Sequence, residues 1–313
     1  LDQDEILLRL MNDSRPATRL VVVAGPTASG KTTLGVKLAE YLDGEIISAD
    51  SRQVYRGMDI GSGKDLDEYG DIPYHLIDIA DPGDEFNVYE FQRCFCEAFA
   101  TIESNAKVPL LVGGTGLYLA SVLDNYHLVE APVDHVRRES LATMTLGELT
   151  DRLKELDPDL HNTTDLLDPQ RTIRAIEIAE SKNRDTQFSV MLPEFKPLIF
   201  GIAWERPVLR NRITIRLRDR LENGLLEEVE RLHDEGVSWE SLHNYGLEYR
   251  FVASYLKGEL NRNDMYQKLN SAIHSFAKRQ QKWFRRMERN GTVIHWLDGE
   301  LDTFPQALKI IQA

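Results

Sequence analysis

The sequence predicts an α/β fold with a mostly parallel sheet covered by helices on both faces. Three apolar segments have the length of buried strands, residues 20–24, 45–49 and 108–112. Segments with helical periodicity, residues 31–42 and 88–106, lie between them. Strands that alternate with helices are typical of parallel sheets, in which ligands bind beyond the carboxyl ends of the strands.

The core is expected to resume late in the chain. Two further strands are predicted at residues 197–203 and 293–296. We therefore expect one core built from residues 20–131 and 197–313, with a leader at residues 1–19. A length of 313 residues suits such a core together with a second, smaller unit.

The segment between the two parts of the core, residues 132–196, has a helical pattern. Thr145 and Glu148 have the spacing of a capping box, which predicts a helix that runs to Leu156. A second helix is predicted over residues 169–181. No strand pattern occurs there, so we interpret the segment as a helical insertion domain.

The composition is that of an ordinary globular protein, with 42% hydrophobic and 28% charged residues. Its apolar stretches are far shorter than the roughly 18 residues that a membrane-spanning helix needs. The acidic N-terminus shows no signal-peptide pattern. We therefore expect a cytoplasmic protein with no membrane association, and we expect it to act as a monomer.

Cysteine and histidine give no sign of a metal cluster. The two cysteines, Cys94 and Cys96, stand two residues apart on an expected helix and so point to different faces. None of the eight histidines has the spacing of a metal-ligand motif. A disulfide framework and a zinc site are both disfavoured.

The strongest chemical signal is a phosphate-binding loop that follows the first strand and opens a helix. Its eight residues match the pattern G-x-x-x-x-G-K-[ST] and are Gly25, Pro26, Thr27, Ala28, Ser29, Gly30, Lys31 and Thr32. In this loop backbone N–H groups and the helix N-terminus face phosphate oxygens, while Lys31 adds charge and Thr32 offers a hydroxyl to Mg²⁺. The motif predicts a P-loop NTPase-like core, but it does not say which bond breaks.

Two more polar segments end strands at the same edge. Asp50 follows the strand at 45–49, and Gly113-Gly114-Thr115 follows the strand at 108–112. In a conventional P-loop enzyme an aspartate in this place is a Mg²⁺ ligand. The same carboxylate is also a candidate general base, so both roles stay open.

Charge is distributed unevenly. A net charge of −14 argues against nucleic-acid binding through the whole surface. Residues 274–289 nevertheless carry six Lys and Arg against Glu288 alone, and residues 206–220 carry six arginines against Asp219 alone. One such run is typical of a solvated helix face, whereas two in the C-terminal half suggest an anionic macromolecular partner.

Taken together, these segments resemble the tRNA dimethylallyltransferase family, also called tRNA isopentenyltransferase. The resemblance runs from about residue 20 to residue 297 and keeps the family's order. It rests on Gly25–Thr32, the block from Asp50 to Gly61, Gly113-Gly114-Thr115 with Leu117-Tyr118, Asp168-Pro169-Gln170-Arg171 with Arg174, and Lys278-Arg279-Gln280 with Trp283 and Arg285. It implies that a dimethylallyl group moves from dimethylallyl diphosphate to the exocyclic amine of the adenine 3′ of the tRNA anticodon, with Mg²⁺ as cofactor.

The chemistry of this transfer assigns roles to particular residues. The amine must lose a proton as the C–N bond forms, so a carboxylate base fits and Asp50 is the candidate. Catalytic roles are therefore expected for Asp50 and for Lys31, and the resemblance implies one for Thr115, which could hold the diphosphate or reach the amine. The leaving group is a diphosphate, which the eight loop residues would hold, and Arg212 and Arg216, one helical turn apart on the basic segment, could close over it.

The resemblance also implies a set of tRNA contacts, in which an adenine leaves the anticodon-loop stack and neighbouring bases are read. This set is Asp50, Ser51, Arg52, Gln53, Thr115, Arg137, Gln170, Arg171, Arg174, Arg250, Lys278, Arg279, Gln280, Trp283 and Arg285. One stretch departs from the family pattern, because Glu248 stands where a Gly-Tyr-Lys or Gly-Tyr-Arg element usually has its glycine.

Two other classes of function remain open on the sequence. A P-loop small-molecule kinase or adenylate prenyltransferase would use the same loop, and a non-catalytic nucleotide-binding adapter would use it without turnover. A kinase consumes ATP and labels an acceptor with phosphate. A tRNA prenyltransferase releases diphosphate and needs the basic C-terminal helices.

Overall fold

The computed structural model describes residues 18–158, 165–184 and 190–312. The chain forms two compact units, one from the described parts of Leu1–Asn125 and Leu192–Ala313, the other from those of Tyr126–Met191. The expected insertion limits of 132 and 196 differ from these by a few residues. The expected leader lies outside the described residues except for Thr18 and Arg19, which belong to the first strand.

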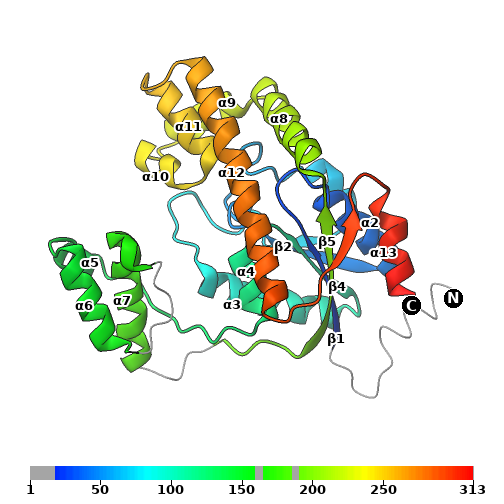
Figure 1. Ribbon diagram of the computed structural model, residues 1–313, viewed down its shortest axis with the longest axis horizontal. Coiled ribbons are helices and arrows are strands. Elements are labelled where there is room, and N and C mark those ends of the chain that lie inside the picture. The colour runs from blue at the N-terminus through cyan, green and yellow to red at the C-terminus, as the bar shows by residue number, and fades with distance from the viewer. Residues whose placement is uncertain (1–17, 159–164, 185–189, 313) are drawn as a thin grey trace. The chain divides into compact units, whose positions relative to one another are not determined.

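The first unit contains a sheet of six strands in the order β3-β2-β4-β1-β5-β6, in which each neighbouring pair is parallel (Figure 1). The strands are β1 (Thr18–Ala24), β2 (Gly44–Ala49), β3 (Tyr74–His75), β4 (Val108–Gly113), β5 (Phe195–Ala203) and β6 (His295–Asp298). The parallel sheet and its helices confirm the predicted fold class.

The register of the central strands positions the candidate site. Ala24 pairs with Gly113, and Gly113 also pairs with Ala49. The last residues of β1, β4 and β2 therefore lie side by side. The three loops that follow these strands leave the sheet at one edge, as expected for ligand binding in a parallel sheet.

Helices cover both faces of the sheet because the strand residues alternate between two cores. Val21 and Val23 pack with α2 (Lys31–Leu42) and α13 (Thr303–Ile311). Leu20 and Val22 pack with α3 (Val88–Ser104), α4 (Gly116–Leu123) and the C-terminal part of α12 (Arg262–Arg289). Every residue of β1 from Leu20 to Val23 is fully buried, which explains its continuous apolar sequence.

A separate helical cluster in the same unit packs beyond the strand ends. It contains α8 (Arg206–Glu222), α9 (Leu225–Asp234), α10 (Trp239–Asn244), α11 (Leu247–Leu256) and the N-terminal part of α12. Its core also includes Val54, Tyr55 and Met58 from the loop after β2. This loop is therefore built into the helical cluster, and it carries a short helix, η1 (Leu66–Tyr69), further on.

The second unit is helical and has its own small core. It contains α5 (His135–Ala142), α6 (Leu146–Leu156), η2 (Asp165–Leu167) and α7 (Pro169–Arg184). Both hydrogen bonds of the Thr145–Glu148 capping box are present, which confirms the predicted start of α6. The core residues are Leu141, Leu149, Leu153, Ile173, Ile176 and Ala179.

Several predicted limits shift. Strand β6 occupies 295–298 rather than 293–296, because Gly291 adopts a positive φ of 101° and Val293 remains 69% exposed. Helix α3 ends at Ser104 rather than 106, because Ala106 has a positive φ of 55°. Strand β3 and helices α4, α5, α9, α10, α11 and α13 had no predicted range. None of the helices in the described ranges is both long and apolar enough to cross a membrane.

Candidate active site

The phosphate-binding loop is shaped to leave N–H groups free. Ala28 and Gly30 adopt left-handed conformations with φ of 61° and 88°, and Gly30 caps α2 without any side-chain hydrogen bond. As a result the backbone N–H groups of Gly30, Lys31 and Thr32 have no acceptor among the described residues. The Ser29 hydroxyl is buried and also has no partner there. Such a set of unsatisfied donors fits an anion.

Lys31 is the cation of this loop. The pKa of its ammonium group is lowered to about 8, mainly by burial and also by the charges of Arg216 and Arg220. Asp50 and Asp65 act in the opposite direction. No carboxylate of the described chain forms an ion pair with Lys31. A buried ammonium group without a counter-ion is costly, so this position also favours a bound anion.

Asp50 and Thr115 meet at the neighbouring strand ends. The Thr115 backbone N–H donates to Ala49 O at 3.1 Å, and the Ser51 N–H donates to the Thr115 hydroxyl at 3.1 Å. Asp50 Oδ1 accepts from the Arg52 N–H at 3.0 Å, whereas Oδ2 has no donor in the described chain. The carboxylate is thus oriented through one oxygen, and its second oxygen and the Thr115 hydroxyl hydrogen remain available for a ligand.

Gln280 connects these two parts of the edge. Its Oε1 accepts from the Thr27 N–H at 2.9 Å, and its Nε2 donates to Gly114 O at 2.9 Å. The side chain is 7% exposed. Both ends of the amide are therefore bonded to protein backbone, which differs from the expected contact with tRNA, and Gln280 holds the phosphate loop against the Gly114 turn.

The arginines of α8 approach the loop from the other side. Arg212 Nε donates to Ala28 O at 2.9 Å, and its guanidinium lies 4.2 Å from the ring centre of Trp204. Trp204 in turn donates from Nε1 to Ser29 O at 2.9 Å. Arg216 forms an ion pair with Asp65. The structure thus gives Arg212 a direct role in shaping the loop, in addition to the charge expected from sequence.

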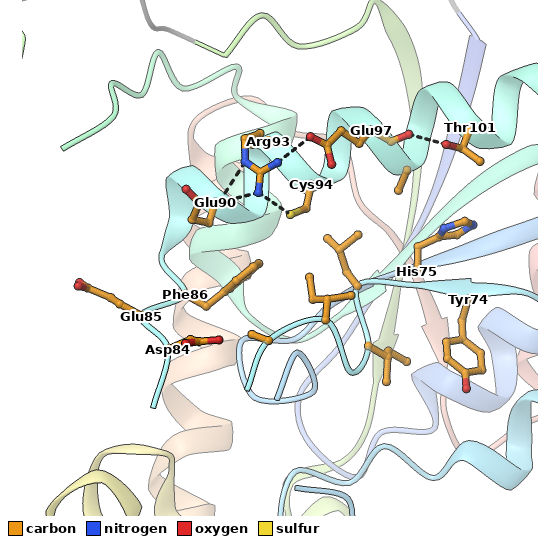
Figure 2. A pocket seen from close by; sticks show the side chains of 15 residues that line it. Tyr74, His75, Asp84, Glu85, Phe86, Glu90, Arg93, Cys94, Glu97 and Thr101 are labelled. Carbon is orange, nitrogen blue, oxygen red and sulfur yellow. Dashed lines mark hydrogen bonds and ion pairs between the residues drawn. The ribbon is translucent and has the colours of Figure 1, made fainter. Parts of the chain in front are cut away.

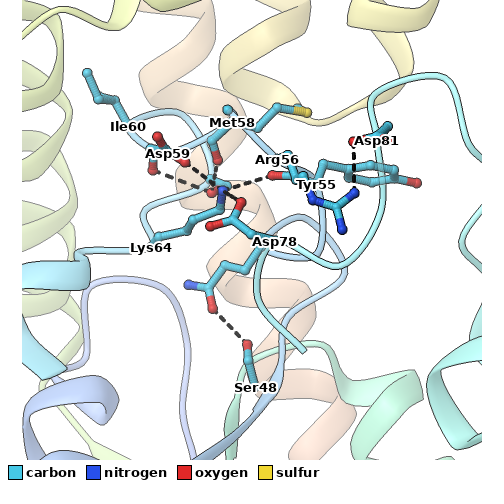
Figure 3. Close-up of polar contacts among 12 residues, drawn as sticks. Ser48, Tyr55, Arg56, Met58, Asp59, Ile60, Lys64, Asp78 and Asp81 are labelled. Atoms are coloured by element: carbon cyan, nitrogen blue, oxygen red, sulfur yellow. Dashed lines mark hydrogen bonds and ion pairs between the residues drawn. The ribbon is translucent and has the colours of Figure 1, made fainter. Parts of the chain in front are cut away.

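The loop after Asp50 is fixed by a buried lysine (Figure 3). Lys64 is fully buried and donates to Tyr55 O at 2.8 Å, to Asp59 Oδ1 at 2.5 Å and to Asp78. Sequence reasoning missed this role, although Lys64 is the one cation among ten carboxylates from Asp59 to Glu90. A single base amid many acids is the signal that could have revealed it.

Gln53 belongs to the same fixed loop. Its Oε1 accepts from the Ser48 hydroxyl at 2.7 Å, and its Nε2 donates to Gly63 O at 3.0 Å. With 7% exposure, the side chain lies inside the protein rather than on a surface that tRNA could contact directly. It therefore links β2 to the Gly63 turn.

Glu228 on α9 anchors the next turn of this loop. Its carboxylate accepts from three successive backbone N–H groups, those of Asp59 at 2.9 Å, Ile60 at 2.7 Å and Gly61 at 2.9 Å. The Tyr249 hydroxyl also donates to it at 2.8 Å. Nothing in the local sequence indicated this contact, because Glu228 is separated from the turn by more than 160 positions.

Among the expected tRNA contacts in the first unit, some side chains are exposed and others pack on or bond to the protein itself. On α12, Lys278, Arg279 and Arg285 are exposed and none forms an ion pair with a carboxylate of the described chain. Trp283 packs on Gly116, where an added Cβ would overlap its ring. Arg250 donates from Nε to His243 O at 3.1 Å.

In the second unit, two of the expected contacts are already paired. Arg137 forms an ion pair with Glu180 at 2.7 Å, and Arg174 forms one with Glu177 at 2.8 Å. Gln170 and Arg171, at the start of α7, are exposed. Of these four expected contacts, only Gln170 and Arg171 are exposed and have no ion-pair partner in the described part of the unit.

The Gly246–Glu248 stretch is where the sequence departs from the family pattern. Gly246 caps α11 with a φ of 140°, a conformation that favours glycine, whereas Glu248 lies in the first turn of that helix. The glycine that the turn requires is therefore present, two residues before Glu248. Glu248 itself is free to serve another purpose.

A cavity of about 770 Å³ lies elsewhere in the first unit, between the β3 segment and α3 (Figure 2). Four carboxylates line it, those of Asp84, Glu85, Glu90 and Glu97. Arg93 is the one lining arginine, and it is paired with Glu90 at 2.9 Å and Glu97 at 2.7 Å. Such a lining repels phosphate, so this cavity suits an anion less well than the strand ends do.

Comparison with known proteins gives consistent matches over nearly the whole chain. A family model described as IPP transferase matches residues 53–287, and one described as isopentenyl transferase matches residues 18–69. The chain is 64% identical over 293 residues to tRNA dimethylallyltransferase 1 of Geotalea uraniireducens, covering 94% of this chain and 97% of that protein. It is 58% identical over 294 residues to tRNA dimethylallyltransferase 2 of Syntrophotalea carbinolica, covering 94% and 99%.

Comparison with solved structures gives matches of the same kind. The chain is similar to the tRNA isopentenylpyrophosphate transferase of Bacillus halodurans, with a TM-score of 0.69, 34% identity and 94% of each chain covered. It also shares its fold with a eukaryotic dimethylallyltransferase acting on tRNA, with a TM-score of 0.75 and 24% identity, covering 93% of this chain and 77% of that one.

Proposed function

The chain belongs to the tRNA dimethylallyltransferase family, and from this premise we propose how its residues transfer a dimethylallyl group from dimethylallyl diphosphate to the exocyclic amine of the adenine 3′ of the anticodon. The observation that carries the assignment is the register of β1, β4 and β2. It sets the phosphate loop, Thr115 and Asp50 side by side at one edge of the sheet.

The diphosphate is proposed to bind in the phosphate loop. The free N–H groups of Gly30, Lys31 and Thr32 would donate to its oxygens, and the orphaned Ser29 hydroxyl would do the same. Lys31 supplies a positive charge that no carboxylate of the described chain neutralises by direct pairing. These donors stabilise the negative charge that develops on the leaving diphosphate as the allylic C–O bond breaks.

A magnesium ion fits the oxygen donors at this edge. Thr32 would hold it, with its other ligands supplied by the diphosphate and water, as Mg²⁺ commonly requires. No group of three His, Cys, Asp or Glu residues within the described ranges could form a metal site by itself. When bound, the ion would neutralise part of the diphosphate charge.

Asp50 is proposed to accept the proton of the amine. The adenine nitrogen forms the new bond to the allylic carbon, the C–O bond to the diphosphate breaks, and the amine proton passes to Asp50 Oδ2. Arg52 holds the other carboxylate oxygen through its N–H, which leaves Oδ2 without a donor in the described chain. The Thr115 hydroxyl, which accepts from Ser51, can donate its hydrogen to the adenine or to the diphosphate.

The tRNA is proposed to bind through the exposed cations of α12 and through Ser51 and Arg52 beside the base. Lys278, Arg279 and Arg285 have no carboxylate partner in the described chain, so they can pair with phosphates. Taking an adenine out of a loop costs less than taking it out of a duplex. The neighbouring bases of such a loop can be read by stacking and by hydrogen bonds to their edges.

One experiment tests this function directly. The protein is incubated with labelled dimethylallyl diphosphate, Mg²⁺ and unmodified tRNA, and the tRNA is then digested to nucleosides. We expect label in N6-dimethylallyladenosine and release of one diphosphate per transfer, with no need for ATP. Phosphate transfer from ATP to a small acceptor, without label in tRNA, would instead establish the kinase alternative.

A further inference from the structure

Arg220 is a buried cation that the roles above do not use. It lies in the last turn of α8, one turn after Arg216, and its side chain is 11% exposed. Burial is the main reason that the pKa of its guanidinium is lowered, and the charge of Arg216 lowers it further. A buried arginine on this helix needs a compensating anion.

The guanidinium groups of Arg220 and Arg216 converge on the Gly63 turn. A Cβ at Gly63 would overlap Arg220 Nη2 and would lie 2.9 Å from Arg216 Nη2. Two like charges so close together, in a partly buried place, repel each other. The charge of Arg220 also acts on Lys31 of the phosphate loop. Three cations from two elements therefore act on one another, with Asp65 paired to Arg216 and Glu248 paired to Arg220.

The partners of Arg220 leave part of its guanidinium unused. Nη1 donates to Gly61 O and to Glu248 Oε1, each at 3.4 Å. No acceptor in the described chain contacts Nε or Nη2. Glu248 is itself 17% exposed, and burial raises the pKa of its carboxyl group while Arg220 and Arg216 lower it. Its one ion pair in the described chain is with Arg220.

We propose that Arg220 is an additional diphosphate-binding residue, which donates from Nε and Nη2 to the leaving group, and that Glu248 is the positioning residue that holds Arg220 toward it. The assignment rests on the proposed function of the phosphate loop. Arg220 takes no part in proton transfer. Its contribution is to add a fixed positive charge opposite Lys31, so that the diphosphate is bound between the loop and α8.

The test uses the full chain and inorganic diphosphate as the probe, with calorimetric binding in the absence of tRNA. Arg220→Gln should weaken diphosphate binding by about tenfold, the usual order for one charge-assisted contact. Arg218→Gln is the matched control, because Arg218 lies on the same helix but is exposed and donates to the Tyr266 hydroxyl. The control should bind diphosphate as the wild type does.

Glu248 is tested by combining substitutions. In a Glu248→Ala background Arg220→Gln should cost less than about twofold, because Arg220 is no longer held in the site. An equal cost in both backgrounds would overturn the positioning role. Unchanged diphosphate binding in Arg220→Gln itself would overturn the whole proposal. If that variant cannot be purified, Arg220→Lys carries the test, and binding equal to wild type would then overturn it.

Failure of the proposed function gives a different pattern. If the proposed function is right, Lys31→Ala should reduce diphosphate binding strongly, whatever the role of Arg220. If neither Lys31→Ala nor Arg220→Gln changes it, the phosphate loop serves another ligand. If only Arg220→Gln is without effect, the loop keeps its role and Arg220 is a structural residue.

Discussion

Helices α8 and α12 are both rich in basic residues, yet their cations are engaged differently. The inward arginines of α8 are each bonded to protein: Arg212 to a loop carbonyl, Arg216 to Asp65 and Arg220 to Glu248. The cations of α12, such as Lys278 and Arg279, are exposed and unpaired within the described chain. Fixed cations suit a small anion of defined geometry, whereas exposed ones suit a polyanion that displaces counterions.

This contrast explains how a protein with a net charge of −14 can act on tRNA. The overall charge repels nucleic acid, but the exposed face of α12 provides a local positive region. The inward arginines of α8 are buried or paired, so they do not offer tRNA an exposed positive surface. The two helices should therefore respond differently to substitution, salt and pH.

The largest effect is expected for Asp50→Asn, which removes the proton acceptor while keeping the shape. Turnover should fall by roughly 10²–10⁴, the usual contribution of a general base, and tRNA affinity should hardly change. Single-turnover rates and tRNA binding on the same preparation measure this. Substantial rescue by excess Mg²⁺ would show that Asp50 acts as a metal ligand instead, and full activity would exclude both roles.

Gln280 sharpens the comparison, because it lies on α12 but faces the phosphate loop. Gln280→Ala leaves the Thr27 N–H and the Gly114 carbonyl without partners, which should lower the free energy of unfolding by about 1–3 kcal/mol. It should also raise the KM for dimethylallyl diphosphate without altering the salt dependence of tRNA binding. Gln281→Ala, at the neighbouring and partly exposed position, is the control. A changed preference among tRNA loop sequences, with normal KM, would instead support base reading by Gln280.

A smaller effect on diphosphate binding is expected when the pH is raised. The pKa of Lys31 in the free protein is lowered to about 8, so its charge is present below that pH and is lost as the pH rises through it. Diphosphate binding should therefore weaken above pH 8, by up to about tenfold for each pH unit. Lys31→Arg keeps its charge throughout and controls for the ionisation of diphosphate itself. Parallel curves for both proteins between pH 7 and 9.5 would show that Lys31 does not titrate there.

Local signals accounted for much of the fold. Helix α2 was predicted to the residue from its periodicity and from the phosphate-loop motif that opens it, and the structure adds the reason for its ends, since Gly30 and Asp43 on either side are left-handed. The start of α6 followed from its capping box. Strands β1, β2 and β4 were predicted within two residues because they are continuous apolar runs.

The site was only partly predictable. Sequence placed Asp50, Thr115 and the phosphate loop at strand ends, and parallel register brings such ends together. It could not reveal that Glu228 accepts from the turn at Asp59–Gly61, or that Glu248 pairs with Arg220, since these contacts depend on how distant helices pack. The family resemblance implied that Gln53 and Gln280 contact tRNA. Sequence could not show that both amides are bonded to protein groups, because an amide can bind a protein group as well as a base edge.

The central claim is that α12 binds tRNA while the phosphate loop and α8 bind the diphosphate. The most direct measurement is tRNA affinity across a salt series for wild type, Lys278→Ala and Arg279→Ala, with inorganic diphosphate affinity measured on the same samples. Each substitution should weaken tRNA binding and make the log–log slope shallower by about 0.7, the value for one single-strand phosphate contact, while diphosphate affinity stays constant. Unaltered tRNA affinity and slope in both variants would contradict the claim, and the tRNA face would then have to be sought among Gln170, Arg171 and the other expected contacts of the helical unit.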